Sequence, residues 1–99
     1  MKQNLKANLA VNNKEVKMNP FVQSYVSNVA MGIVSSLKGV DYISLVEIKL
    51  EKDSVTIKVN KEDITLTPFP NDIIASTMKG LVSSLKGVND IKTIEIHLK

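Results

Sequence analysis

The heptapeptide Val-Ser-Ser-Leu-Lys-Gly-Val occupies residues 34–40 and recurs, unchanged, at residues 82–88. Extending this 48-residue offset in both directions aligns 41 residue pairs, of which sixteen are identical. So much identity between two short segments indicates an internal repeat. We therefore predict a tandem duplication, with repeats at about 5–51 and 53–99 that together form a single domain, 1–99.

Each repeat contains a stretch whose apolar residues recur every three or four positions, as in an amphipathic helix. The predicted core-facing positions are Phe21, Val22, Tyr25, Val26, Val29, Ala30, Ile33, Val34 and Leu37 in the first repeat and Phe69, Ile73, Ile74, Thr77, Met78, Leu81, Val82 and Leu85 in the second. Asn19 and Thr67 each precede a proline, which is typical of a capped helix start. A Lys-Gly pair then predicts that the helices end near residues 38 and 86.

The period of the apolar residues changes to two after each helix, at residues 45–51 and 93–99, as in a half-buried strand. Residues 7–11 and 55–59 match as a second strand, and a short strand before each helix is expected to end at Met18 or Leu66. Each repeat thus follows the order strand, strand, helix, strand, and is too small to be stable alone. We predict an α+β fold: one two-layer sandwich of about six mostly antiparallel strands, with two helices on one face.

The composition excludes several chemistries. The 99 residues, 43% of them apolar, include no cysteine, which rules out disulfide bonds, thiolate nucleophiles and Cys-ligated zinc. All thirteen basic residues are lysine, so the net charge of +3 comes without arginine, the residue that most often contacts guanine and clamps phosphate. No apolar run is long enough for a membrane span or a signal peptide. We expect a soluble cytoplasmic protein with no membrane partner.

Few residues carry recognisable catalytic chemistry. His97 is the only histidine, on the outward face of the last predicted strand, with no cysteine or HExxH motif to accompany it. Glu47 and Glu95 match across the repeats and form either a carboxylate pair near a two-fold axis or cross-strand charge pairs with lysines. We favour the surface interpretation of all three. The sequence therefore predicts no catalytic, cofactor or metal site, and no enzyme.

One face of each predicted helix carries small residues one turn apart. They are Asn28, Gly32 and Ser36 in the first helix and Ser76, Gly80 and Ser84 in the second. A glycine inside a helix costs about 1 kcal/mol relative to alanine, so the space should serve a purpose. We predict a close helix-helix contact with the two glycines near the crossing point. The alternative is a groove that admits a ligand or a partner's side chain.

The first predicted helix carries no charge between residues 21 and 37. The side chains expected on its solvent side are Ser24, Ser27, Met31 and Ser35. An uncharged face that includes a methionine is typical of a surface that is covered part of the time. We predict that this face is a protein interface, most simply in a homodimer; the alternative is a tolerated serine-rich surface.

These features favour a non-catalytic protein-interaction or structural module that self-associates or binds a protein partner. One alternative is weak nucleic-acid binding through lysines near one end of the sheet, namely Lys6, Lys14, Lys17, Lys58 and Lys61, although the chain lacks arginine and an aromatic platform. Another is a small ligand held in a cleft between Met18, Met31, Met78 and the sheet, for which a core of this size leaves little room.

Overall fold

The computed structural model of the chain describes residues 5–37, 42–85 and 90–99. These residues form one six-stranded antiparallel sheet and two helices, an α+β sandwich as predicted. The elements, in chain order, are β1 (Ala7–Val11), β2 (Lys14–Glu15), α1 (Pro20–Ser35), β3 (Val46–Glu51), β4 (Ser54–Val59), β5 (Glu62–Ile64), α2 (Pro68–Ser83) and β6 (Thr93–Leu98).

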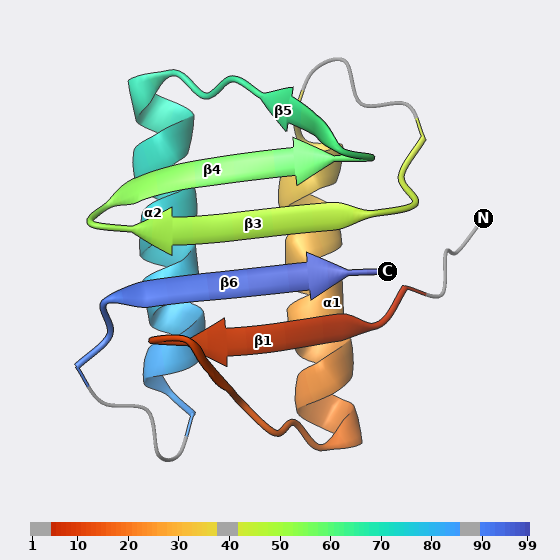
Figure 1. The fold of residues 1–99 in the computed structure, drawn as a ribbon, viewed down its shortest axis with the longest axis vertical. Coiled ribbons are helices and arrows are strands. Elements are labelled where there is room, and N and C mark those ends of the chain that lie inside the picture. The colour runs from red at the N-terminus through yellow and green to blue at the C-terminus, as the bar shows by residue number, and fades with distance from the viewer. Residues whose placement is uncertain (1–4, 38–41, 86–89) are drawn as a thin grey trace.

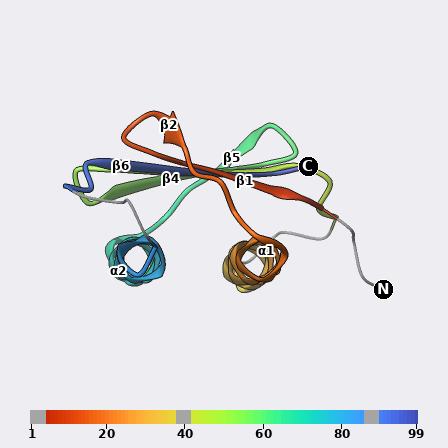
Figure 2. The same cartoon turned by 90° about the horizontal axis from the view of Figure 1, so that it is seen from below.

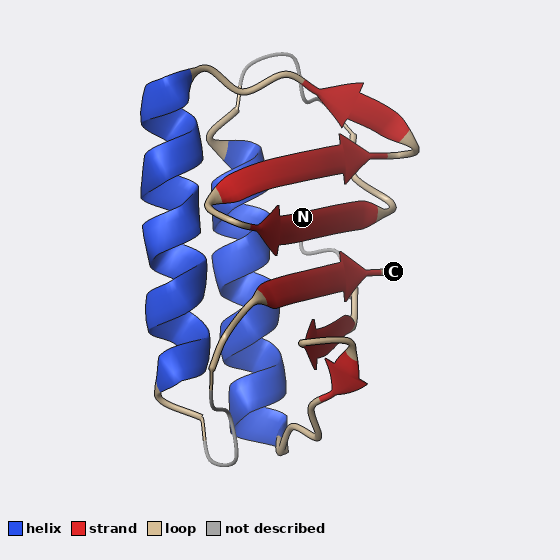
Figure 3. Cartoon of the chain, turned by 60° about the vertical axis from the view of Figure 1, so that its left-hand side comes forward, coloured by secondary structure: helices blue, strands red, loops and turns tan. Residues whose placement is uncertain are grey.

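The strands lie in the order β2-β1-β6-β3-β4-β5, and every neighbouring pair is antiparallel. Both helices run behind the sheet across its strands (Figure 1). Seen along the sheet, α1 and α2 lie side by side on one face, while β2 and β5 rise from the other (Figure 2). The oblique view shows the helical layer and the sheet as two separate layers (Figure 3).

The strand pairing follows the 48-residue offset of the sequence. Leu9 pairs with Ile96, and the residues 48 positions away, Ile57 and Ile48, also pair. Ile48 itself lies opposite Ile96, so this pair maps onto itself and marks the centre of the relation between the halves. Because β6 separates β1 from β3, each half supplies strands to the sheet of the other. The duplication itself stays a hypothesis that rests on the sequence.

The core lies between the sheet and the helices. Alternate residues of the four long strands face it, and Ile48, Ile57, Ile94, Ile96 and Leu98 are fully buried. Each helix contributes only a narrow buried stripe: Val26, Ala30 and Val34 from α1, and Ile74, Ala75, Met78 and Val82 from α2. No charged or polar residue of the described chain is buried in this layer. The apolar positions of the strands are therefore as the alternation predicted.

The three tight turns of the sheet are two-residue hairpins whose central residues all have positive φ. They are Asn12-Asn13, Lys52-Asp53 and Asn60-Lys61. Positive φ at both central positions defines the type I′ turn, which matches the twist of the flanking strands and which Asn and Asp tolerate better than other non-glycine residues. The Lys52-Asp53 turn lies where the two sequence repeats meet, so β3 and β4 form a hairpin across that junction.

Several element boundaries differ from the prediction. Both helices end three residues earlier, at Ser35 and Ser83. In α1 the N–H of Ser36 bonds to the carbonyl oxygens of Gly32 and Ile33 and tightens the last turn. The predicted stop glycines lie outside the described residues. The short strands end at Glu15 and Ile64 instead of Met18 and Leu66, because the chain must leave the sheet to begin a helix on its other face.

The helices are also rolled on the sheet relative to the prediction. Phe21 and Phe69, expected in the core, are 74% and 73% exposed, and Tyr25 and Ile73 are 52% and 48% exposed. Apolar residues cover more of each helix than a flat sheet can contact, so only one stripe of each helix is buried against it. The larger residues at the N-terminal end of each helix therefore face solvent.

Candidate functional site

A groove runs between α1 and α2 on the surface away from the sheet. One section, of about 560 Å³, lies between the N-terminal half of α1 and the C-terminal half of α2; its lining includes Phe21, Tyr25, Val29, Ser76, Gly80 and Ser84. The second section, of about 400 Å³, lies between the opposite halves; its lining includes Gly32, Ile33, Ser36, Phe69, Ile73 and Thr77. The 48-residue offset relates the two sections, because each combines aromatic or aliphatic residues from one helix with small residues from the other.

Of the five large apolar residues that are exposed in the described part of the chain, four lie in the walls of this groove: Phe21, Tyr25, Phe69 and Ile73. The rings of Phe21 and Tyr25 are stacked, with centroids 6.1 Å apart and an interplanar angle of 17°. Stacking of this kind holds two aromatic side chains in one orientation in front of the groove. Solvent-exposed apolar side chains that cluster on one surface are typical of a binding site.

The predicted small-residue stripe lies along this groove. Five of its six residues line the groove: Gly32, Ser36, Ser76, Gly80 and Ser84. The sixth, Asn28, is exposed on α1. A Cβ placed on Gly32 or on Gly80 would meet no atom within 4 Å. The glycines therefore do not mark a tight crossing of the helices, and the space beside them is open. This geometry agrees with the groove that the sequence left as the alternative.

The four positions of α1 that were predicted as an interface do not all face solvent, because the helix is rolled on the sheet. Ser24 and Ser35 are exposed, but Met31 is half-buried and packs against the core. The hydroxyl of Ser27 donates a hydrogen bond of 3.1 Å to the carbonyl oxygen of Leu5. Two of the four side chains are thus engaged within the chain, and the exposed face of α1 is centred instead on Phe21, Tyr25 and Gly32.

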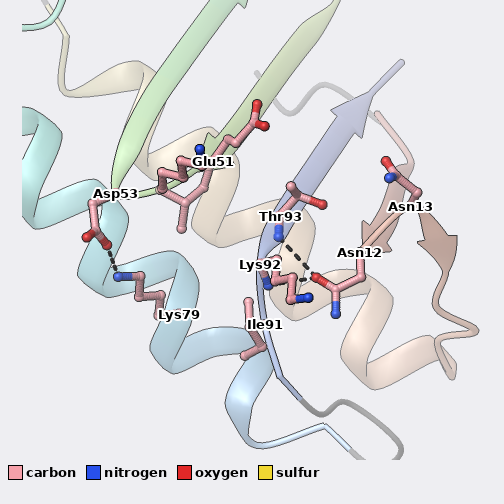
Figure 4. Close-up of a pocket in the computed structure, with 10 residues that line it drawn as sticks. Asn12, Asn13, Glu51, Asp53, Lys79, Ile91, Lys92 and Thr93 are labelled. Atoms are coloured by element: carbon pink, nitrogen blue, oxygen red, sulfur yellow. Dashed lines mark hydrogen bonds and ion pairs between the residues drawn. The ribbon is translucent and has the colours of Figure 1, made fainter.

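A second hollow, a polar notch of about 620 Å³, lies at the end of the sheet where the β1–β2 and β3–β4 turns approach the start of β6 (Figure 4). Lys52, Lys79 and Lys92 line it, together with Glu51, Asp53 and Thr93. Asp53 and Lys79 form an ion pair across it. This site is not visible in the sequence, because its residues come from four separate segments of the chain.

The side chain of Asn12 connects the β1–β2 turn to the segment that leads into β6. Its Oδ1 accepts hydrogen bonds from the backbone N–H groups of Lys92 (2.6 Å) and Thr93 (3.1 Å), and its Nδ2 donates to the carbonyl oxygen of Asp90 (2.8 Å). Asn60 makes the equivalent set with Ser44, Leu45 and Tyr42 in the other half. The identity of these asparagines across the repeats was the only sequence signal of this arrangement.

The face of the sheet away from the helices is polar. Glu47 lies opposite Lys58 on one side and His97 on the other, and Lys49 lies opposite Glu95. The Nε2 of His97 is 3.6 Å from an Oε1 of Glu95. The pairing places Glu47 and Glu95 in the cross-strand arrangement that the sequence favoured.

The sequence offered two alternative binding sites, a group of lysines at one end of the sheet and a cleft beside three methionines, and the structure places their residues differently from the expectation. Lys14 lies in β2 and Lys61 in the β4–β5 turn, at opposite edges of the sheet, so the lysines do not gather at one end as expected. Met78 is fully buried, and Met18 and Met31 pack partly buried against the core. These three methionines therefore contribute to the packing of the helical layer.

Two further searches of the described residues are negative. No group of three or more His, Asp or Glu side chains in this part of the chain is placed to hold a metal ion. Neither α1 nor α2 has the length and apolar character that crossing a membrane requires. Comparison of the chain with models of protein families, with curated proteins and with solved structures found no match.

Proposed function

We propose that this chain is a non-catalytic protein-interaction module that binds a second copy of itself through the groove between α1 and α2. The observation that carries this proposal is the exposure of Phe21, Tyr25, Phe69 and Ile73 around that groove. Burying a side chain of this size removes enough apolar surface from water to contribute about 1.5–3 kcal/mol. Four such groups on one face supply the central anchors that interfaces need.

The charges of the helical layer favour an uncharged partner surface. The described part of α1 has no charged side chain, and the two charged side chains of α2, Asp72 and Lys79, do not line the groove. A basic or acidic partner would find no opposite charge there, whereas an identical surface can approach without repulsion. This favours a second copy over a charged peptide or a nucleic acid.

The symmetry and the size of the surface support the same partner. The 48-residue relation gives the groove two similar sections running in opposite directions, each with an aromatic residue beside open space. A two-fold dimer needs such a self-complementary patch. The molecule measures 36 Å by 30 Å across its two longer axes, the plane in which the helical layer lies, and a stable interface needs about 800 Å² per partner. The face is large enough.

The test is the solution mass by size-exclusion chromatography with light scattering, over a series of concentrations. We expect a species of twice the chain mass of 10.9 kDa, which the double variant Phe21→Lys, Phe69→Lys converts to monomer. Both residues are highly exposed, so neither change removes core packing. Refractive index gives the concentration because the chain has no tryptophan.

The matched control is the double variant Ser24→Lys, Ser35→Lys, which adds the same two charges to exposed positions of α1 outside the groove lining. We expect it to remain a dimer. A wild-type chain that is monomeric at every concentration would overturn the proposal. A dimer that survives the phenylalanine changes but is lost in this control would move the interface to the flank of α1.

A further inference from the structure

The polar notch is the place where the two halves of the molecule differ most in chemistry. Lys79, Lys92 and Thr93 line it, and the residues 48 positions earlier are Met31, Ser44 and Leu45. Met31 and Leu45 are half-buried, and Met31 packs against the core. The second half thus has an ammonium group in place of the apolar Met31, a second ammonium group in place of Ser44, and a threonine in place of Leu45.

The charges around the notch do not cancel. Of its three lysines, Lys79 forms an ion pair with Asp53, whereas no described carboxylate lies within ion-pair distance of Lys52 or Lys92. Glu51 is the remaining acidic residue of the lining, and it lies opposite Thr93 on the face of the sheet away from the helices. The lining therefore has three lysines and two carboxylates, an excess of one positive charge.

One residue that lines the notch has a buried polar atom without a hydrogen-bond partner. Thr93 Oγ1 is buried and has no hydrogen-bond partner among the described residues. Leaving a buried hydroxyl without a hydrogen bond is unfavourable, and the leucine 48 positions earlier shows that the fold accepts an apolar side chain there. A polar residue retained at a structural cost is a recurring feature of functional sites.

We propose that the notch binds the phosphate group of a small soluble molecule, with the ammonium groups of Lys52 and Lys92 on either side of the anion. The lining has one more lysine than carboxylates, and lysine binds phosphate as a compact point charge. Ile91 and Leu50 supply an apolar wall for the rest of the molecule. The other lysines of the sheet are spread over separate strands, with Lys14 in β2, Lys49 in β3 and Lys58 in β4.

The experiment is a titration of the full chain with inorganic phosphate, monitored through the backbone amide signals in two-dimensional NMR spectra. Phosphate replaces sodium chloride during the titration, so that the ionic strength stays constant. We expect saturable shifts in the amides of residues 52–53 and 92–93. The double variant Lys52→Asn, Lys92→Ser introduces the residues found 48 positions earlier, and we expect it to weaken phosphate binding at least tenfold. Asparagine also tolerates the positive φ of 49° at residue 52.

Two single variants sharpen the assignment. Asp53→Asn releases Lys79 from its ion pair, keeps a residue suited to positive φ, and should tighten phosphate binding two- to threefold. Lys61→Asn makes the same change as Lys52→Asn in the turn with positive φ at the other end of β4, and should leave binding unchanged.

Three results would overturn the proposal. The first is a set of shifts that rise linearly without saturation, and the second is a titration that chloride reproduces. The third is an equal loss of binding in Lys61→Asn and in the notch variant, which would indicate general attraction to a positive surface. A single-stranded oligonucleotide that binds through Lys61 as strongly as through the notch would assign the lysines to nucleic-acid binding instead.

Discussion

The two halves of this protein share a backbone plan and differ in their surfaces. Their helices begin and end 48 residues apart, and their strand registers obey the same offset around the Ile48–Ile96 pair. The residue that corresponds to Met31 of the first half, however, is Lys79 in the second half, and Lys79 lines the hollow at one end of the sheet. The comparison teaches that the core constrains both halves alike, while the positions outside it are free to acquire separate roles.

The largest effect is expected at the centre of the relation between the halves. Ile48 and Ile96 are both fully buried and lie opposite each other. Truncating either one to alanine removes the same packing, so we expect each change to lower the free energy of unfolding by about 2–5 kcal/mol. Urea denaturation of both variants measures this. Costs that differ by more than about 1 kcal/mol would show that the halves do not contribute equally to the core.

A smaller effect separates the two helix starts. Asn19 Oδ1 accepts a hydrogen bond of 2.8 Å from the backbone N–H of Val22, whereas Thr67 makes no side-chain cap. We expect Asn19→Ala to cost about 1 kcal/mol, and Thr67→Ala only a few tenths, because only the first removes a hydrogen bond. Thermal unfolding of the pair provides the comparison. Equal losses would contradict the difference in capping.

The smallest effect, and the one of opposite sign, is expected at Gly32 and Gly80. Each lies inside a helix, and a Cβ on either would meet no atom within 4 Å. Gly32→Ala and Gly80→Ala should each raise the stability of the monomer by roughly 0.5–1 kcal/mol, because alanine loses less conformational freedom on folding. In the same variants, the added methyl groups narrow the groove and should weaken self-association.

Stability measured in the background Phe21→Lys, Phe69→Lys separates these two contributions. In that background the groove is expected to be unoccupied, so only the gain in helix stability should remain. A loss of monomer stability in either glycine variant would show that the glycine is needed for packing within the chain, and that the open space is not reserved for a partner.

Much of the local structure follows from short-range patterns. Pro20 and Pro68 mark the helix starts, and the alternation of Val46, Ile48 and Leu50 identifies a strand with one buried face. These patterns depend on hydrogen bonds and contacts between residues at most four positions apart, which is why they are visible in one sequence. The ends of the elements were predicted less accurately. In α1, Ser36 closes the last turn before the glycine that was expected to do so.

The candidate sites were only partly predictable. The small-residue stripe pointed to the space between the helices, but the exposure of Phe21 and Tyr25 beside it was not expected. A helix that is apolar around most of its circumference has several faces able to meet a sheet. The choice among them depends on the whole core, since the side chains of α1 pack against strands from both halves.

The internal repeat, the order of the elements and the alternation within each strand are properties of the amino-acid sequence alone, since each follows from neighbours along the chain. The insertion of β6 between β1 and β3, the roll of the helices, and the meeting of Lys52, Lys79 and Lys92 around one hollow are decided by the tertiary structure. Each depends on contacts between segments far apart in the chain, and the packing of a single shared core selects among the arrangements that local pattern permits.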